Sequence, residues 1–291
     1  MKKFLAIAFA ALLSVSCLTS CTKKDVNNDD KANTNQVENV VENNEENAQQ
    51  PENQEAEAQK FVLGFDASFP PYGYTDPETG DYIGFDLDLA AEVCKRNNWE
   101  LVLQPIDWDA KDAELDSGNI NCIWNGFTIN GREDLYEWTD AYVDNSQVFV
   151  VKKESGIADY AGLAGKVVAV QKDSSAEAAL NEEDKADLLS SFAQVVTCAE
   201  YATAFMDLEA GAVEAIAMDV GVAKFQIAGK EDTFAILDEV LAAEQYGIGF
   251  KKGNTELRDA VQATLIEMVN DGTFAAISEK WFGYDVGVIG K

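Results

Sequence analysis

The pattern of hydrophobic and polar residues divides the chain into three stretches. Residues 4–15 are apolar almost without interruption, and residues 22–60 show no hydrophobic period. Residues 61–291 alternate between short apolar runs, which are typical of buried strands, and stretches with apolar residues three or four positions apart, which are typical of helices that cover a sheet. The third stretch therefore predicts a globular α/β body.

Strands and helices are expected in alternation along this body. The predicted strands are residues 61–65, 101–103, 120–124, 148–151, 166–170, 194–197, 215–218 and 247–250. The predicted helices are residues 85–97, 109–117, 174–180, 201–210, 220–227 and 255–270. Two successive β-α-β-α-β runs predict two lobes, each a mainly parallel sheet flanked by helices. We expect residues 60–151 and 245–291 to form lobe 1 and residues 152–244 to form lobe 2, joined by a two-strand hinge.

The N-terminus has the features of an export signal. Lys2 and Lys3 precede an apolar run that is too short to span a bilayer and suits the core of a signal peptide. Leu18-Thr19-Ser20-Cys21 then resembles the lipobox of bacterial lipoproteins, in which the chain is cut before the cysteine and the sulfur is lipidated. We therefore expect residues 1–20 to be a signal peptide and Cys21 to carry lipid.

Two alternatives to lipidation at Cys21 remain. Cys17 is a competing site, although Ser14 stands where the motif wants an aliphatic residue. A plain secretory signal would instead release the protein.

The segment after Cys21 predicts a disordered linker over residues 21–59. Residues 22–60 hold nine Asn, ten Asp plus Glu, four Lys, one proline and no aromatic residue. Such a segment buries too little apolar surface to offset the entropy lost on ordering. The body would then float near the outer face of the cytoplasmic membrane, either in a periplasm or on a Gram-positive surface.

Composition excludes several classes of function. The formal net charge of −30 disfavours nucleic acid as a partner and could steer a cationic small molecule. The chain has no histidine, so neither an imidazole base nor a histidine metal ligand is available. We expect no catalytic residue, no cofactor and no metal. Three cysteines lie in the body, and we expect Cys94, Cys122 and Cys198 to be buried thiols rather than a disulfide framework.

Residues with binding chemistry follow the predicted strands. In open α/β sheets a ligand binds beyond the carboxyl ends of the strands. The residues expected there are Asp66, Phe69, Trp108, Asn125, Gly126, Thr128, Arg132, Ser174, Ser175 and Asp219. Together these residues suit a small zwitterion. The arginine and the serine-capped helix suit a carboxylate, the two isolated aspartates suit an ammonium, and the aromatic rings suit an aliphatic stem. Taken singly, each has a plainer explanation as a core residue, a helix cap or a surface charge.

The body also resembles the family-3 extracellular solute-binding proteins of polar amino-acid ABC transporters. The resemblance covers residues 60–284 and rests on several motifs together. These motifs are Gly64-Phe65-Asp66-Ala67-Ser68-Phe69-Pro70-Pro71-Tyr72, Gly84-Phe85-Asp86-Leu87-Asp88-Leu89, Asp107-Trp108-Asp109, Phe127-Thr128-Ile129-Asn130-Gly131-Arg132, Trp138-Thr139-Asp140-Ala141-Tyr142, Asp271-Gly272-Thr273-Phe274 and Glu279-Lys280-Trp281-Phe282-Gly283. It implies the two-lobed type II periplasmic-binding-protein fold.

The resemblance also implies a role for each site residue. Arg132 would clamp the α-carboxylate of an amino acid, helped by Thr128 and by the backbone at Ser174 and Ser175. Asp219 would take the α-ammonium, with Asn125 or the Gly126 carbonyl assisting. Phe69 and Trp108 would sandwich the side-chain stem, and Asp66 would meet the ligand side chain.

This sequence departs from the family pattern at two places. The common Thr-Pro-Glu before the arginine is one residue shorter here, Asn130-Gly131, and the Gly-Thr or Gly-Ser turn reads Asp173-Ser174. The second departure adds a negative charge near the expected carboxylate site.

The function expected from the resemblance is capture of a polar L-amino acid, with basic side chains among the candidates, by closure of the hinge. The closed form, a monomer, would deliver the ligand to an ABC permease driven by its ATPase. Two other functions on the same fold stay open at this point. One is an amino-acid-sensing module that signals to a partner, and the other is a dehydratase-like enzyme, for which no carboxylate pair is placed by the sequence.

Overall fold

The computed structural model describes residues 58–291. The expected signal peptide, lipidation at Cys21 and nearly all of the expected linker lie outside the described residues. Within residues 58–291, no helix combines the length and the apolar character needed to cross a membrane.

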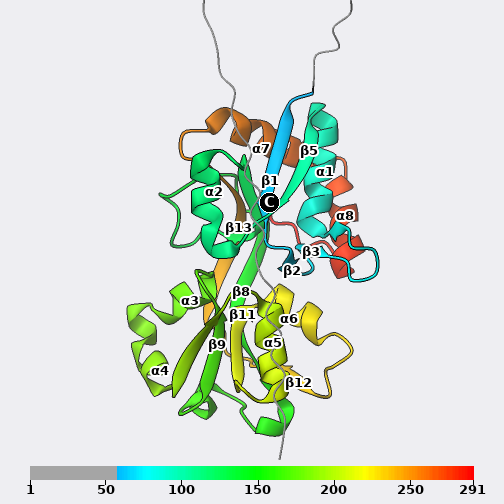
Figure 1. Cartoon of the computed structure of the whole chain (residues 1–291). Coiled ribbons are helices and arrows are strands. Elements are labelled where there is room, and N and C mark those ends of the chain that lie inside the picture. The colour runs from blue at the N-terminus through cyan, green and yellow to red at the C-terminus, as the bar shows by residue number, and fades with distance from the viewer. Residues whose placement is uncertain (1–57) are drawn as a thin grey trace, which may run out of the picture. The chain divides into compact units, whose positions relative to one another are not determined.

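One ten-stranded sheet organises the fold (Figure 1). Its strands follow the order β10-β9-β11-β8-β13-β6-β1-β5, with β12 paired to β8 and β7 paired to β13. Their bounds are β1 Lys60–Phe65, β5 Glu100–Pro105, β6 Cys122–Thr128, β7 Glu137–Trp138, β8 Val143–Lys152, β9 Val167–Gln171, β10 Gln194–Cys198, β11 Ala215–Asp219, β12 Phe234–Ile236 and β13 Ala242–Phe250. β1 is parallel to β5 and β6, and β9 is parallel to β10 and β11.

Two long strands, β8 and β13, join these parallel groups. β13 is antiparallel to both β6 and β8, and β8 is antiparallel to β11. A separate small sheet has the order β2-β3-β4, with β2 Ser68–Phe69, β3 Gly73–Thr75 and β4 Tyr82–Ile83.

The helices flank the two parallel groups (Figure 1). Their bounds are α1 Phe85–Asn97, α2 Lys111–Ser117, α3 Ser175–Leu180, α4 Ala186–Ser191, α5 Tyr201–Ala210, α6 Val220–Ile227, α7 Thr255–Asn270 and α8 Thr273–Phe282. Single 3₁₀ turns cover η1 Trp108–Ala110, η2 Lys153–Ser155, η3 Tyr160–Leu163 and η4 Glu183–Lys185. α7 and α8 pack on each other and on α1, whereas α3 and α5 pack on β8, β9 and β11. The last two helices of the chain therefore lie beside its first one.

Helix ends follow the local chemistry that the sequence predicted. Asn98, Gly118 and Gly211 each adopt the left-handed conformation that closes a helix, and each donates its backbone N–H to the last turn. Ser174 caps α3 by accepting the backbone N–H of Glu177 at 3.1 Å.

Three strands differ by several residues from their predicted bounds, and the other predicted strands differ by one or two residues at an end. β6 runs from Cys122 to Thr128, so Asn125, Gly126 and Thr128 lie within a strand, not in the loop after it. β8 and β13 each extend well beyond the runs 148–151 and 247–250. The cause is pairing: β13 lies between β6 and β8, and these backbone ladders lengthen strands whose own side chains are not continuously apolar.

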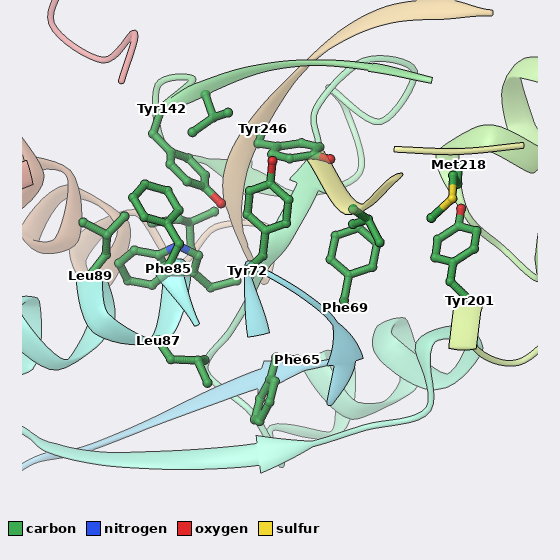
Figure 2. Close-up of a cluster of buried hydrophobic side chains, with 14 of the residues drawn as sticks. Phe65, Phe69, Tyr72, Phe85, Leu87, Leu89, Tyr142, Tyr201, Met218 and Tyr246 are labelled. Carbon is green, nitrogen blue, oxygen red and sulfur yellow. The ribbon is translucent and has the colours of Figure 1, made fainter. Parts of the chain in front are cut away.

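An aromatic cluster fills the core beside the strand ends (Figure 2). Phe69 lies between Tyr72 and Tyr201, with ring centroids 5.7 Å and 6.1 Å away. The Tyr72 ring meets that of Tyr246 edge-on at 5.3 Å. These rings link residues from distant parts of the chain into one packed unit.

All three body cysteines are free thiols. Cys94 and Cys122 are buried, as predicted, but Cys198 is only half-buried. Cys198 is the last residue of β10, next to a cavity, which explains its exposure.

Candidate functional site

Asp86 fixes the segment of β6 that carries three of the expected site residues. Asp86 lies in the first turn of α1 and is fully buried. Its Oδ2 accepts the Gly126 N–H at 2.6 Å, and its Oδ1 accepts the Tyr142 hydroxyl at 2.9 Å. Burial raises the pKa of Asp86 to about 7, with these hydrogen bonds opposing the rise. Asp86 therefore acts as a buried clamp on the strand.

Gly126 needs to be glycine. Its φ is 54°, and an added Cβ would lie 2.9 Å from Cε1 of Phe69 and 3.0 Å from Cε2 of Tyr246. A side chain here would strain the backbone and push two aromatic rings of the core apart.

Asp66 directly follows β1 and lies close to a residue of β6. Its backbone N–H donates to Asn125 Oδ1 at 2.5 Å, and its side chain accepts from the Gln171 amide at 2.7 Å and from the Ser68 N–H at 2.8 Å. Gln171 ends β9, so this contact joins the two parallel strand groups. Burial raises the pKa of Asp66 to about 6.

Asp66 also lines a cavity of about 260 Å³. The walls include Trp108 and the acidic side chains of Asp107, Asp109 and Glu200. The cation on the cavity wall, Lys172, is engaged by Asp109 at 2.6 Å. The cavity therefore has an acidic lining with a buried carboxylate at one end.

The two aromatic residues expected to sandwich a ligand are not in contact with each other in this structure. Phe69 is buried between Tyr72 and Tyr201. Trp108 lies edge-on to Phe127 with ring centroids 5.4 Å apart, and the Lys111 ammonium lies 5.3 Å from the Trp108 ring centroid. Only Trp108 lines the acidic cavity.

Arg132 lines a second, open cleft of about 910 Å³, together with Ser174, Ser175 and Glu244. Its guanidinium makes only two long contacts, to the Thr128 carbonyl at 3.4 Å and to the Asp173 carbonyl at 3.5 Å, and it lies 5.3 Å from the Phe127 ring centroid. No ion pair engages Arg132 within the described part of the chain. A bidentate donor is therefore free at the edge of this cleft.

The charge that Asp173 adds to its turn is neutralised by a partner from another element. Asp173 has a φ of 58° and pairs through its carboxylate with the ammonium of Lys111, which opens α2 and is 2% exposed. The carboxylate is therefore already engaged by a cation and does not stand free against an incoming anion.

Asp219 ends β11 inside a buried hydrogen-bond network. Its Oδ1 accepts the Tyr246 hydroxyl at 2.5 Å, the Gln147 amide at 2.7 Å and the Asn145 amide at 2.8 Å. Burial, with the neighbouring Glu244 adding to it, raises the pKa of Asp219.

Glu244 joins this network to the residues of the open cleft. Its Oε1 accepts the Thr128 hydroxyl at 2.9 Å, and the Ser175 hydroxyl lies at 3.4 Å. The Thr128 and Ser175 hydroxyls are themselves 3.2 Å apart. Arg132, Thr128, Ser175 and Asp219 are thus connected through one set of contacts.

The sequence did not point to several residues that build this region. These are Asp86, Asn145, Gln147, Gln171 and Glu244. Only the motif Gly84–Leu89 marked one of them, and Glu244 was missed because β13 was expected to begin at Gly247.

The arrangement suits a ligand with charges of both signs. Buried carboxylates attract a cation, the unpaired guanidinium attracts an anion, and the acidic cavity suits hydrogen-bond donors. No group of three or more histidine, cysteine, aspartate or glutamate side chains within residues 58–291 could hold a metal ion.

Comparison with known proteins gives a consistent result. Residues 61–284 match the model of the bacterial extracellular solute-binding proteins, family 3. The L-cystine-binding protein TcyJ of Escherichia coli (strain K12) is 31% identical over 229 residues, covering 78% of this chain and 84% of that protein. The lysine/arginine/ornithine-binding periplasmic protein of the same organism is 30% identical, covering 77% and 88%.

A solved structure shows the same fold. It is an ABC uptake transporter substrate-binding protein from Streptococcus pneumoniae with bound histidine, 31% identical, with a TM-score of 0.75. The match covers 79% of this chain and 94% of that one.

The Asp86 clamp makes stability depend on pH. A carboxyl group whose folded pKa is raised stabilises the fold when protonated, and that contribution is lost as pH rises from the unfolded value of 3.8 through the folded value of about 7. Asp86→Asn keeps the shape and removes the charge, so we expect it to reduce the loss of stability between about pH 5 and pH 8 by roughly 2–4 kcal/mol. Urea unfolding at both pH values measures this.

Asp238→Asn, at an exposed aspartate, is the matched control and should leave the pH dependence unchanged. Asp66 and Asp219 contribute with the same sign, so part of the dependence remains in the Asp86 variant. A variant with the full wild-type pH dependence would contradict the clamp.

Proposed function

Because the chain belongs to the bacterial extracellular solute-binding proteins of family 3, we propose that it captures a polar L-amino acid by hinge closure and delivers it to an ABC importer. It works outside the cytoplasm as an amino-acid-binding component of an ABC uptake transporter. The family is one of binding proteins, so the chain is not an enzyme and no catalytic residue is assigned to it.

One observation carries the proposal. Arg132, which has no ion pair within residues 58–291, is connected through Thr128 and Glu244 to a buried acidic network at one cleft. We propose that Arg132 clamps the α-carboxylate, with the N-terminus of α3 at Ser174 and Ser175 assisting. Asp219 receives the α-ammonium, with Asn125 or the Gly126 carbonyl assisting.

The strand pairing supports a two-lobed body with a hinge. β8 and β13 are the strands that connect the parallel group β1-β5-β6 with the parallel group β9-β10-β11. We assign residues 60–151 and 245–291 to lobe 1 and residues 152–244 to lobe 2. Ligand docks on lobe 1, between Phe69 and Trp108, and lobe 2 closes over it.

The acidic cavity supports a ligand side chain that donates hydrogen bonds. Asp66 lies at its buried end, and Asp107 and Glu200 line its wall. An ammonium or guanidinium group meets this lining best, which favours arginine, lysine or ornithine. Neutral or mixed donors such as glutamine, histidine and cystine form the next group of candidates.

We further propose that the mature protein is a monomer held by lipid on Cys21 at the outer face of the cytoplasmic membrane. The permease and ATPase of the importer are its partners. The lipobox-like stretch Leu18–Cys21 supports the anchor, because two or more acyl chains hold a protein stably on a bilayer.

Arg132→Ala is expected to weaken amino-acid binding by about 2–5 kcal/mol, because the ligand carboxylate would be buried without its cation. Isothermal titration with the amino acid that gives the largest shift in a thermal-unfolding screen measures the loss. Arg258→Ala, which removes the same charge from α7, should bind as the wild type does. A loss of less than threefold for Arg132→Ala would reject its role.

Asp66→Asn separates cationic from neutral ligand side chains. Above about pH 6 the Asp66 carboxyl is ionised, so its removal should weaken L-arginine binding tenfold or more and L-glutamine binding by less than threefold. Titrations with both ligands near about pH 8 test this, with the surface variant Asp81→Asn as the control. Equal losses of affinity for L-arginine and L-glutamine would contradict the proposal that Asp66 contacts the ligand side chain.

Cys21→Ala is expected to move the protein from the membrane fraction to the soluble fraction. Without the sulfur, no thioether-linked lipid forms and the apolar free energy of anchoring is lost. Detergent phase partition of cells expressing the full chain measures the distribution. Cys17→Ala is the matched control and should stay with the membrane, and release of Cys17→Ala in place of Cys21→Ala would move the anchor to Cys17.

A further inference from the structure

Asp219 and Glu244 share the same two hydrogen-bond donors. The Asn145 Nδ2 group lies 2.8 Å from Asp219 Oδ1 and 2.6 Å from Glu244 Oε1. The Gln147 Nε2 group lies 2.7 Å from each of the same two oxygens. The Asn145 NH₂ group therefore gives one hydrogen to each carboxyl group, and the Gln147 NH₂ group bridges the same two oxygens while also lying 2.9 Å from the Ser175 hydroxyl. The two carboxyl groups are thus held side by side.

This pair is buried without a cation. Asp219 is 3% exposed and Glu244 is 6% exposed, and neither forms an ion pair with any residue in 58–291. Two like charges that share the same donors in a low-dielectric site repel strongly, so such pairs retain one proton. The other oxygens, Asp219 Oδ2 and Glu244 Oε2, have no hydrogen-bond partner within that range and are available for a proton or a ligand.

The two amides that bridge the carboxyl groups have side-chain oxygens without a hydrogen-bond partner in residues 58–291. The buried side-chain oxygens of Asn145 and Gln147 accept no hydrogen bond within residues 58–291, and Gln147 is fully buried. Buried acceptors without donors are rare in folded proteins. The two amide groups that hold the carboxyl pair therefore keep an acceptor that no residue in 58–291 uses.

The other titratable groups around the pair do not supply the missing charge. Tyr246 on β13 donates to Asp219, and Tyr72 and Tyr201 face the same region from the loop after β2 and from α5. Burial raises the pKa of all three phenols, so they stay neutral. Arg132 donates to the Thr128 carbonyl, and the Thr128 hydroxyl donates to Glu244, so Arg132 reaches the pair only through Thr128.

We propose that Asp219 and Glu244 hold one proton between them in the empty site and that the ligand's α-ammonium replaces this proton on binding. The carboxyl O–H bond breaks, the proton passes to solvent, and the ammonium donates N–H bonds to both carboxylates. The net charge of the site is unchanged by the exchange. This rests on the proposed function and makes Glu244 a second ligand of the ammonium.

The exchange gives Thr128 a different role from the one that the family resemblance implied. Its hydroxyl donates to Glu244 and so orients the second carboxylate, leaving the ligand carboxylate to Arg132 and the start of α3. Ligands whose α-nitrogen is acylated or replaced by a hydroxyl group lack the cation and should be rejected.

The test measures the protons released when L-arginine binds the full-length protein, with L-glutamine as a second probe. Titration calorimetry in two buffers of different ionisation enthalpy, near about pH 6.5, gives the number of protons. We expect release of close to one proton per ligand. Because binding releases a proton, the affinity should increase as the pH is raised toward neutrality, by up to about tenfold per pH unit. Glu244→Gln should still bind but release fewer protons, because Asp219 then has no carboxyl neighbour.

Controls separate this pair from other sources of protons. Asp66 can also ionise when a cationic ligand binds, but it remains in Glu244→Gln, so the difference between the two proteins reports the pair alone. Glu256→Gln, at an exposed position on α7, should release as many protons as the wild type. If Glu244→Gln fails to fold, ¹³C NMR of the side-chain carboxyl groups in the wild type replaces it, and both carboxyls should be ionised only with ligand bound.

The outcomes are distinct. Wild-type binding without proton exchange, or equal release from Glu244→Gln and wild type, overturns the shared proton while the proposed function stands. In the NMR measurement, two ionised carboxyl groups in the ligand-free protein do the same. Absence of binding by all six candidates, L-arginine, L-lysine, L-ornithine, L-glutamine, L-histidine and L-cystine, overturns the proposed function, and the shared proton with it.

Discussion

The burial of carboxyl groups that no cation of residues 58–291 pairs with is the constraint on which the candidate site depends. The register of four neighbouring strands brings their hydrogen-bond donors to them. Asp219 on β11 lies opposite Gln147 on β8, Asn145 on β8 lies opposite Glu244 on β13, and Tyr246 on β13 lies opposite Thr128 on β6. Because side chains alternate along a strand, the pairs 145/147 and 244/246 each point to one face. A shift of one residue in any of these pairings would turn the donors to the other face and leave the carboxyl groups unpartnered.

Much of the fold could be read from the sequence because local chemistry specifies it. The helix ends at Asn98 and Gly211 follow from the left-handed conformation those residues adopt, and the Ser174 cap follows from its side-chain oxygen. The first half of β13 could not be read in this way. Residues 242–246 carry Glu and Gln between small and aromatic residues, so they form a strand only because β8 and β6 pair with them. The site residues that the sequence missed lie largely on these long connecting strands.

The residues expected at strand ends identified only part of the site, because contacts between distant segments complete it. Asp66 and Asp219 do stand at the ends of β1 and β11, where the chemistry of open α/β sheets places ligands. Asp173 raised an electrostatic difficulty that its own sequence neighbourhood could not resolve. Its counter-ion, Lys111, comes from a helix 62 residues earlier in the chain. A second ion pair, Lys172 with Asp109, runs between the same two segments. The exposed pair contributes little to stability, whereas the buried Lys111 depends on its partner.

The acidic side chains act on a ligand both at long range, through the net charge, and at short range, through the buried carboxyl groups. The short-range interactions are the stronger ones. The formal net charge of −30 is spread over a surface where salt screens interactions beyond about 8 Å. It therefore affects the rate of encounter with a cation more than the affinity. Asp66, Asp219 and Glu244 are 3–6% exposed and are screened far less, because they sit in a low-dielectric environment. The orientation of these weakly screened carboxyls is set by their amide partners, Gln171 for Asp66 and the amides of β8 for the other two.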